Sequence, residues 1–253
     1  MPDPLPSYVV VGASGGIGSE VCRRLAVRGA NLLLAGRDVA KLEALASELR
    51  GLNAAADYHP HPLDATKSAE VDAAFAAAVE RFGTLAGVTN LVGSILLKPA
   101  HLTSDDEFEQ TLTLNLRTAF YVLRAAAKAM LTTGGSVVLA STVATRIGLA
   151  NHEAIAAAKG GVNGLVLAAA ASYAGRNIRV NAVAPGLVDT PLAAKITGSE
   201  LALKASTAMH PLGRIGRPAD VANVVALLLD PANSWLTGQV IGIDGGLGSV
   251  RGK

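Results

Sequence analysis

The residues best suited to chemistry near the start of the chain are the glycines Gly12, Gly16 and Gly18, which lie between an apolar stretch and a helical pattern. Residues 8–11 are mostly β-branched and predict a buried strand, and the pattern after Gly18 predicts a helix. Glycine permits a turn with unusual φ and lets a ligand approach the backbone. Because the first N–H groups of a helix bind anions, this spacing predicts a loop that holds the pyrophosphate of a dinucleotide.

A second candidate binding residue follows the next predicted strand, which continues into Gly36-Arg37-Asp38. An acidic side chain here would bind the ribose hydroxyls of adenosine and reject a 2′-phosphate. Gly36 offers no carboxylate, and Arg37 could pair with a 2′-phosphate through charge-assisted hydrogen bonds. Asp38 either caps the next helix or turns inward toward the ribose. We therefore expect NADP(H) as the cofactor, with NAD(H) as the alternative.

The rest of the chain alternates between strand and helix patterns. Strands are expected over residues 31–35, 54–58, 87–92, 136–140, 178–184 and 239–243, with a His-Pro-His-Pro turn after the weak strand at 54–58. Helices are expected over residues 20–28, 39–49, 68–82 with Ser68 as cap, 104–130 as two helices, 151–173 and 218–229. This alternation predicts an α/β fold with a doubly wound parallel sheet in three layers, and residues 1–253 are expected to form one domain.

Composition and spacing argue against several classes of partner. The chain has 22 Lys+Arg against 20 Asp+Glu, a net charge of +2 that does not favour nucleic acid or an anionic membrane. Residues 1–7 lack the charged start and apolar core of a leader, and no long uncharged apolar stretch predicts a membrane span. The single cysteine, Cys22, is expected to be a small buried side chain. No metal site is expected, and four histidines are assigned to loops or the surface: His59, His61, His101 and His210. We expect a soluble, cytoplasmic protein that acts on a small molecule.

Further motifs resemble the short-chain dehydrogenase/reductase family, particularly members like 3-oxoacyl-carrier-protein reductase. The glycine loop is similar to the family's T-G-x-x-x-G-I-G, with Val11 in place of threonine. Asn90-Leu91-Val92-Gly93 stands where the family has N-N-A-G, and residues 179–186 resemble the segment that borders the nicotinamide. Thr237-Gly238-Gln239 and Asp244-Gly245-Gly246 match the C-terminal strand region. The resemblance implies a Rossmann fold over nearly the whole chain.

The resemblance also implies which residues bind the cofactor. They are Gly12, Ser14, Gly15, Gly16, Ile17 and Gly18 at the pyrophosphate, Arg37 at the 2′-phosphate, Asp64, Asn90 and Gly93 on the adenosine side, Lys159 at the nicotinamide ribose, and Pro185, Gly186, Val188 and Thr190 around the ring and carboxamide. Family members commonly form oligomers, which implies a homo-oligomer (dimer or tetramer) assembled through residues 104–130 and 151–173.

The catalytic segment departs from the family pattern. The family has a serine and, thirteen residues later, the tyrosine of Tyr-x-x-x-Lys, with an asparagine that corresponds to Asn115. Lys159 is present, Thr142 stands at the serine position after Ser141, and the tyrosine position is Ile155. Isoleucine can neither transfer a proton nor form a hydrogen bond. The loss of a positioned general acid typically costs about 10²–10⁴-fold in rate.

His152 is a candidate replacement for the missing tyrosine. It lies seven residues before Lys159, so two helical turns should place both on nearly the same face. Enoyl reductases of the same superfamily use a Tyr-x6-Lys spacing. A histidine here could hydrogen-bond the substrate oxygen and stabilise an enolate during conjugate reduction, with Asn115 and Thr142 also facing the substrate. Alternatively, His152 is a polar residue at the start of a helix.

Residues 190–212 are predicted to form a lid over the substrate. Lys195 and Lys204 in this segment could meet an acidic substrate, or they could simply be solvated. Two functions are compatible with the sequence. The first is an NADP(H)-dependent oxidoreductase that transfers hydride to a carbonyl or conjugated C=C bond of a small or acyl-thioester-like substrate, through an atypical site. The second, prompted by Ile155, is a non-catalytic NADP-binding sensor or an inactive partner subunit.

Overall fold

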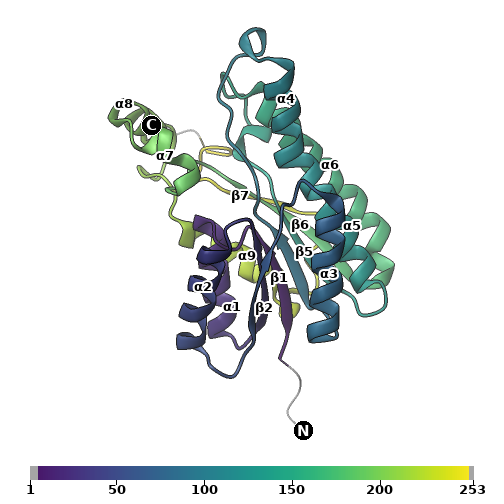
Figure 1. Cartoon of the computed structure of the whole chain (residues 1–253). Coiled ribbons are helices and arrows are strands. Elements are labelled where there is room, and N and C mark those ends of the chain that lie inside the picture. The colour runs from purple at the N-terminus through teal and green to yellow at the C-terminus, as the bar shows by residue number, and fades with distance from the viewer. Residues whose placement is uncertain (1–4, 251–253) are drawn as a thin grey trace.

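Seven strands form one parallel sheet in the computed structural model, which describes residues 5–250 (Figure 1). They are β1 (Ser7–Val11), β2 (Asn31–Gly36), β3 (Tyr58–Pro62), β4 (Gly87–Asn90), β5 (Gly135–Ala140), β6 (Ile178–Pro185) and β7 (Val240–Ile243). Their order is β3-β2-β1-β4-β5-β6-β7. The chain therefore runs outward from β1 to β3 and then outward from β4 to β7, and the direction reverses between β1 and β4. The predicted doubly wound parallel sheet is confirmed.

Helices cover both faces of the sheet and complete three layers (Figure 1). One face carries α1 (Gly16–Val27), α2 (Val39–Leu52) and α9 (Pro218–Leu229), and the other carries α3 (Ser68–Phe82), α5 (Thr118–Met130) and α6 (Glu153–Tyr173). A separate apolar core fills the space between the sheet and each helical layer. α4 (Asp105–Leu112) continues into α5 through a π-helical turn, Thr113–Arg117, so residues 104–130 contain two helices as predicted.

The glycine loop joins β1 to α1 by close backbone contact. Gly12 has a φ of +85°, in the left-handed region that favours glycine. A methyl group on Gly18 would collide with the carbonyl oxygen of Gly12. α1 begins at Gly16, earlier than the predicted start at residue 20, so the loop's last glycines form the first helical turn.

Strand β3 differs from its prediction. It spans Tyr58–Pro62 rather than residues 54–58, so the expected His-Pro-His-Pro turn is itself a strand that pairs with β2. Proline cannot donate to a sheet ladder and is tolerated in edge strands, where its nitrogen can face away from the neighbouring strand. β3 is the edge of the sheet, which explains why Pro60 and Pro62 fit. The predicted cap of α3 is also wrong, since Ser68 lies inside the helix and Lys67 precedes it.

Helix α6 begins two residues later than predicted. Its first residue is Glu153, and His152 is the N-cap residue without a capping hydrogen bond from its side chain. Asn151 before it has a φ of +63°, a left-handed turn that asparagine tolerates. Residues 153–176 are long and apolar enough to cross a membrane by length and composition, at a mean hydropathy of 1.5. This is weak evidence for a span, because core helices pass the same test and 44% of this segment is buried in the protein.

The predicted lid is made of three short helical segments. They are η5 (Pro191–Ala193), α7 (Ala194–Thr197) and α8 (Glu200–Met209), with a break at Gly198. The side chain of Ser199 caps α8 by accepting a hydrogen bond from the Ala202 N–H, 3.4 Å long. The lid and α4 rise on opposite sides of the carboxyl edge of the sheet (Figure 1).

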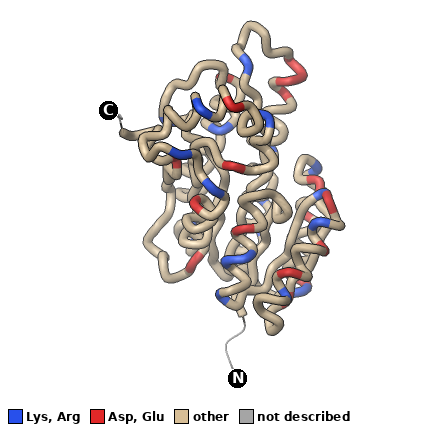
Figure 2. The backbone as a smooth tube through the Cα atoms, turned by 90° about the vertical axis from the view of Figure 1, so that its left-hand side faces the viewer, with Lys and Arg blue, Asp and Glu red and all other residues tan. Residues whose placement is uncertain are grey.

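Acidic and basic side chains are interleaved along the chain (Figure 2). Several pair across elements, such as Arg23 with Glu48 at 2.6 Å and Arg124 with Asp72 at 3.3 Å. The small net charge therefore reflects two mixed, nearly balanced sets of charges.

We expect Gly18→Ala to lower the free energy of unfolding by about 1–3 kcal/mol, because the new methyl group must push apart β1 and the start of α1. Urea unfolding measures this change. Gly51→Ala is the matched control, since Gly51 lies in α2 with nothing within 4 Å of an added methyl group. The control should be neutral or stabilising by about 0.5–1 kcal/mol. Equal stability of the two variants would contradict the close contact.

Candidate active site

The predicted pyrophosphate loop lies at the carboxyl end of β1, beside the point where the sheet reverses direction. Open α/β sheets bind ligands in this position. The first turn of α1 follows Gly15 and has no side-chain cap, so its N–H groups are available to an anion. Thr190 lies against the loop, because a methyl group on Gly16 would be 2.8 Å from its Cγ2 atom. The side chain of Ile17 packs against the core, so Ile17 can offer only its backbone to a ligand.

Asp38 points toward its own helix. Its carboxylate accepts a hydrogen bond of 3.1 Å from the Lys41 N–H and forms an ion pair with the Lys41 ammonium at 3.0 Å. The helix-capping interpretation of Asp38 is thus confirmed. Arg37 is exposed beside Asp64 in a cleft of about 560 Å³. Hydrogen bonds from Thr66 lower the pKa of Asp64, and the charges of Lys67 and Arg37 lower it further.

Gly93, Asn115 and Lys159 come together at the ends of β4 and β5. A methyl group on Gly93 would lie 2.8 Å from Asn115 Oδ1 and 3.5 Å from Lys159 Nζ, so only glycine fits here. Lys159 is 6% exposed, and its ammonium donates a hydrogen bond of 2.7 Å to the carbonyl oxygen of Ala140. This burial excludes the surface lysine that a solvated helix face would carry. It lowers the pKa of Lys159 from 10.5 to about 8.

The π-helical turn holds the buried Asn115 side chain in place. Its Nδ2 donates to Ser94 Oγ and to the Thr111 carbonyl oxygen, both at 2.9 Å, and its Oδ1 accepts from the Ser94 N–H at 3.1 Å. π-helical turns inside α-helices are often found at functional sites. Ser94 was not predicted from the sequence. Its position directly after Gly93 was the only available signal.

Thr142 and Ser141 differ in how their hydroxyl groups are used. Ser141 Oγ donates to Asn163 Oδ1 at 2.6 Å and is buried, so it fixes the start of the loop after β5. The Thr142 hydroxyl accepts a long hydrogen bond of 3.4 Å from the Ala144 N–H and keeps its proton available to donate. Asn90, also predicted, is buried at the end of β4 and accepts from the Val92 N–H at 3.2 Å.

Ile155, expected from the motif spacing to stand at the tyrosine position, lies one turn before Lys159 and is 6% exposed. His152 does not lie within α6 as predicted, because it precedes the first helical residue and is only partly buried. Its Nδ1 lies 2.8 Å from the Ala150 carbonyl oxygen, so this nitrogen must carry a proton. Since neutral imidazole has one N–H, Nε2 can donate to a ligand only when His152 is doubly protonated. A 2.8 Å hydrogen bond from the Lys98 N–H to the Asn151 carbonyl oxygen joins the segment after β4 to the residue before His152.

The nicotinamide border predicted at residues 185–190 continues from β6. Within it, Val188 is buried and pairs with Gly216, and Gly186 packs against His210. His210 lies in the bend after α8, in agreement with its assignment to a loop, but it is buried at 3% exposure and is not a surface residue. His59 and His61 are half-buried and belong to β3, contrary to a loop assignment, and His101 is exposed. Within residues 5–250 no three His, Cys, Asp or Glu side chains are arranged to hold a metal.

A second cleft, of about 450 Å³, lies at the opposite, amino edge of the sheet between Gly135, Arg179 and Trp235. It contains none of the predicted site residues, whereas the glycine loop, Asn90, Gly93 and the Ala140 partner of Lys159 all lie at the carboxyl ends of strands. The candidate active site therefore lies at the carboxyl edge.

We expect Lys159→Met to change how stability depends on pH. The pKa near 8 in the folded protein lies below the value of 10.5 for an unburied lysine, so unfolding takes up a proton between these pH values and the unfolding free energy rises with pH there. Below pH 8 both states are protonated and the cost of burial is complete, about 3 kcal/mol at about 1.4 kcal/mol per pKa unit. The methionine variant lacks this titration.

Urea unfolding from pH 7 to 10.5 measures the difference between wild type and variant. The wild type should gain stability relative to Lys159→Met across this range, whereas the exposed Lys128→Met control should run parallel to wild type. A parallel course for Lys159→Met as well would show that Lys159 is not a buried ammonium.

Residues 12–248 match the family model described as "Enoyl-(Acyl carrier protein) reductase". The chain is 34% identical over 242 residues to 3-oxoacyl-[acyl-carrier-protein] reductase FabG of Thermotoga maritima, covering 94% of this chain and 96% of that protein. It is 36% identical over 242 residues to galactitol 2-dehydrogenase (L-tagatose-forming) of Cereibacter sphaeroides, covering 94% and 92%.

Solved structures share the fold. A short-chain type dehydrogenase/reductase from Mycobacterium ulcerans superposes with a TM-score of 0.93 at 33% identity, covering 98% of this chain and 92% of that one. The actinorhodin polyketide ketoreductase with NADPH gives a TM-score of 0.90 at 31% identity, covering 97% and 98%. As its motifs predicted, the chain belongs to the short-chain dehydrogenase/reductase family of oxidoreductases.

Proposed function

We propose that the protein is an NADP(H)-dependent oxidoreductase that transfers hydride to a carbonyl or conjugated C=C bond of a small or acyl-thioester-like substrate. The observation that carries this proposal is the buried Lys159 ammonium, held by the Ala140 carbonyl beside Gly93 and Asn115. Burying an ammonium group is costly unless it has partners. An ammonium group has three N–H donors, of which the Ala140 carbonyl oxygen accepts one. A ribose hydroxyl is a suitable acceptor for the others.

The residues around the glycine loop support NADP(H) over NAD(H). Asp38 is engaged by Lys41, so its carboxylate is not turned toward a ribose, and the exposed Arg37 guanidinium is available to a 2′-phosphate. The uncapped start of α1 suits the pyrophosphate. When bound, the cofactor supplies the hydride. One relative of known structure, the actinorhodin polyketide ketoreductase, was solved with NADPH.

The proton on the substrate oxygen must come from a group other than the family's tyrosine. His152 is our candidate, assisted by the Thr142 hydroxyl. Asn115 was expected to face the substrate, but both of its amide donors are engaged by Ser94 and Thr111, so we assign it to positioning this region. Because Nδ1 of His152 is engaged with Ala150, donation from Nε2 requires the doubly protonated ring. Reduction of a conjugated C=C bond demands less from this group than reduction of a ketone, since stabilising an enolate oxygen is sufficient.

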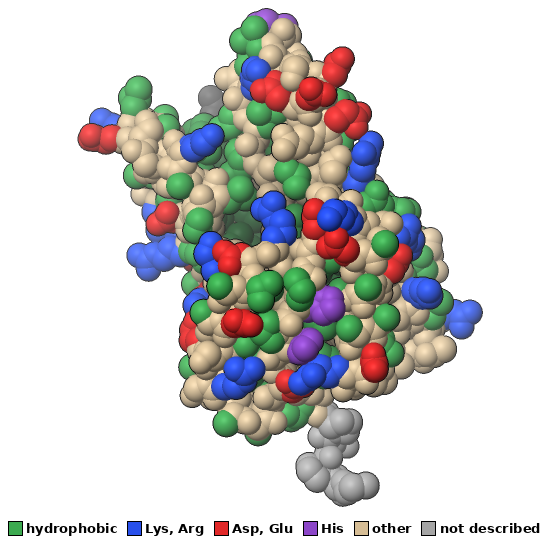
Figure 3. Space-filling model, in the orientation of Figure 1, with side chains coloured by type: hydrophobic (Ala, Val, Ile, Leu, Met, Phe, Trp, Pro, Cys, Tyr) green, Lys and Arg blue, Asp and Glu red, His purple; other side chains and the backbone are tan. Residues whose placement is uncertain are grey.

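Apolar side chains around the entrance favour a substrate with an apolar portion. The molecular surface has a hollow between the lid and the segment that follows β4, with hydrophobic side chains inside it and on its rim (Figure 3). Exposed apolar residues occur on both segments: Ile95 and Leu97 after β4, and Leu192, Leu201 and Leu212 in the lid. Exposed apolar clusters of this kind mark binding surfaces. An acyl chain fits this description, and relatives include an acyl-carrier-protein reductase and a polyketide ketoreductase.

A non-catalytic NADP-binding protein is the second candidate function. The buried Ile155 favours it, because this side chain fills the position of the family's acid with a group that transfers no proton. In this case Lys159 and Asn115 would serve cofactor binding alone, and the protein would act as a sensor or as an inactive partner subunit.

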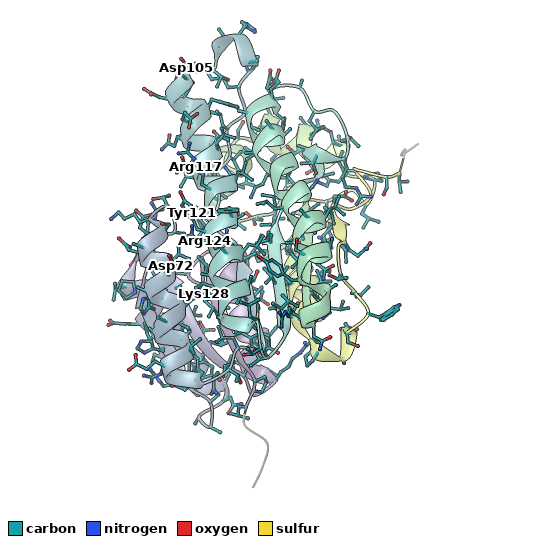
Figure 4. All side chains as sticks on the ribbon, turned by 90° about the vertical axis from the view of Figure 1, so that its right-hand side faces the viewer. Asp72, Asp105, Arg117, Tyr121, Arg124 and Lys128 are labelled. Carbon is teal, nitrogen blue, oxygen red and sulfur yellow. The ribbon has the colours of Figure 1, made fainter. Side chains whose placement is uncertain are left out.

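We further propose a homo-oligomer, dimer or tetramer, in the cytoplasm. Tyr121, Arg124 and Lys128 on the outer side of α5 lie in a row with Arg117 of the preceding π-helical turn, and Arg124 reaches Asp72 on α3 (Figure 4). Phe120 on α5 and Leu167 on α6 are also exposed and would be covered by a second copy. Sedimentation velocity of the purified protein distinguishes a monomer from these assemblies.

The first experiment compares a 3-oxoacyl thioester with the corresponding 2-enoyl thioester as substrates, following NADPH oxidation and identifying the products. Turnover of either substrate establishes the oxidoreductase and shows which bond accepts the hydride. Tight NADPH binding without turnover of these or a broad carbonyl panel would favour the binding protein. Absence of NADPH binding would refute both.

We expect Arg37→Ala to weaken NADPH binding by about 10- to 100-fold, the usual worth of a hydrogen bond between charged groups. NADH binding should change by less than about twofold, because NADH lacks the 2′-phosphate. Fluorescence titration measures both affinities. Arg50→Ala, at the far end of α2, is the control and should leave the NADPH to NADH ratio unchanged. An unaltered ratio in Arg37→Ala would remove Arg37 from the site.

We expect His152→Ala to lower kcat by about 10²-fold or more while leaving NADPH affinity intact. Ile155→Tyr restores a phenol one turn before Lys159, so it should raise ketone reduction and make turnover less dependent on His152. Ile155→Leu is the control for repacking alone. Unchanged kcat in His152→Ala would eliminate the histidine as the donor, and unchanged turnover in Ile155→Tyr would show that this position does not face the substrate.

A further inference from the structure

His210 connects three segments around the candidate site. It follows the last residue of α8 in the lid and is almost completely buried. Its Nδ1 donates a hydrogen bond of 2.6 Å to the Ser206 carbonyl oxygen within the lid. Its Nε2 accepts a hydrogen bond of 3.3 Å from the Leu187 N–H, in the backbone that continues from β6. Since a neutral imidazole has one donor and one acceptor nitrogen, these two partners use both.

The neighbouring backbone is shaped to admit this ring. A methyl group on Gly186 would lie 2.5 Å from His210 Nε2 and 3.1 Å from Cδ2, so any larger residue would displace the imidazole. On the other side, the Leu212 N–H donates to the Gly245 carbonyl at 3.1 Å, which fastens the end of the lid to the loop after β7. The ring is therefore enclosed between the lid, the end of β6 and this loop.

Leu187, which His210 holds, lies only a few residues before Thr190, the residue that contacts the glycine loop. Val188 follows directly and pairs with Gly216, and Thr190 lies against Gly16 of the glycine loop. Backbone hydrogen bonds to Ile243 and Gly216 also hold this stretch, so the His210 bond is its link to the lid in particular, and a displacement of α8 that broke the bond would uncouple the two segments. In the other direction, a ligand that holds Thr190 in place would stabilise the lid through the same bond.

We propose that His210 is a positioning residue that couples the substrate lid to the backbone bordering the nicotinamide. The proposal rests on the proposed function for the identity of that border. In this arrangement His210 touches neither substrate nor hydride. It holds the lid in the position in which α8 and residues 185–190 enclose the substrate from two sides, so its loss weakens substrate binding more than the chemical step.

The test compares His210→Leu, which fills the space without hydrogen bonds, with His210→Gln, whose amide offers both a donor and an acceptor. The first readout is amide hydrogen exchange at Leu187 and residues 199–213, with and without NADPH. We expect His210→Leu to lose protection in these segments, to lose the extra lid protection that NADPH gives the wild type, and to keep protection in β1 and β5. His210→Gln should restore most of both, and the exposed His101→Leu control should match wild type.

A second readout uses the substrate that the thioester comparison identifies. His210→Leu should raise KM by about five- to tenfold, as expected for one lost hydrogen bond, with kcat within about twofold of wild type. Gly186→Ala is compared by exchange without nucleotide, because Gly186 borders the proposed cofactor site. It should also lower lid protection by displacing the ring, and this loss should shrink in the His210→Ala background, where the space is open.

Some results would overturn the proposal. These are wild-type exchange at Leu187 and in the lid of His210→Leu, a loss of protection throughout the protein that His210→Gln does not restore, or equal effects of Gly186→Ala in both backgrounds. Exchange measured without nucleotide shows whether His210 joins the lid to the backbone after β6. This result does not depend on whether NADPH binds. Failure of NADPH binding would therefore refute the proposed function separately.

Discussion

The fold depends on the contact between Gly18 and the carbonyl oxygen of Gly12, which brings the first turn of α1 directly onto the end of β1. No side chain separates the two, so the axis of α1 is fixed relative to the sheet at the point where the strand order reverses. Thr190 then closes over Gly16 from the far half of the sheet. The end of the candidate site that we propose for the pyrophosphate is thus built from backbone groups, whose positions are set by the fold itself.

The other end of the site is defined by a buried charge. Lys159 keeps its ammonium group away from water with the Ala140 carbonyl as its acceptor, and the adjacent Gly93 leaves space beside it. If a tyrosine stood at the position of Ile155, its phenol group would interact with this ammonium charge. Here the neighbouring side chain is apolar, so the field of the ammonium acts on whatever ligand enters. Such a field favours developing negative charge on a substrate oxygen and also favours an anionic ligand that never reacts.

Local patterns predicted most of the fold, since the glycine loop and the alternation of helices and strands follow from periodicity and spacing. Gly93 was expected on the adenosine side, and its approach to Asn115 and Lys159 was not predicted. Some errors are local, such as the Ser68 cap, and others concern long-range placement. The burial of His210 depends on segments 20 to 35 residues away in the chain, around Gly186 and Gly245, which no local pattern reports. The Ala140 acceptor is a backbone atom and has no sequence signal.

The prolines of β3 have a consequence for how the molecule meets other molecules. Pro60 and Pro62 remove backbone donors from one margin of the sheet, so an added strand could form only an incomplete ladder there. β7 at the opposite margin contains no proline and retains its donors. The two margins are therefore unequal. An added strand would therefore find a more complete set of backbone donors at β7 than at β3.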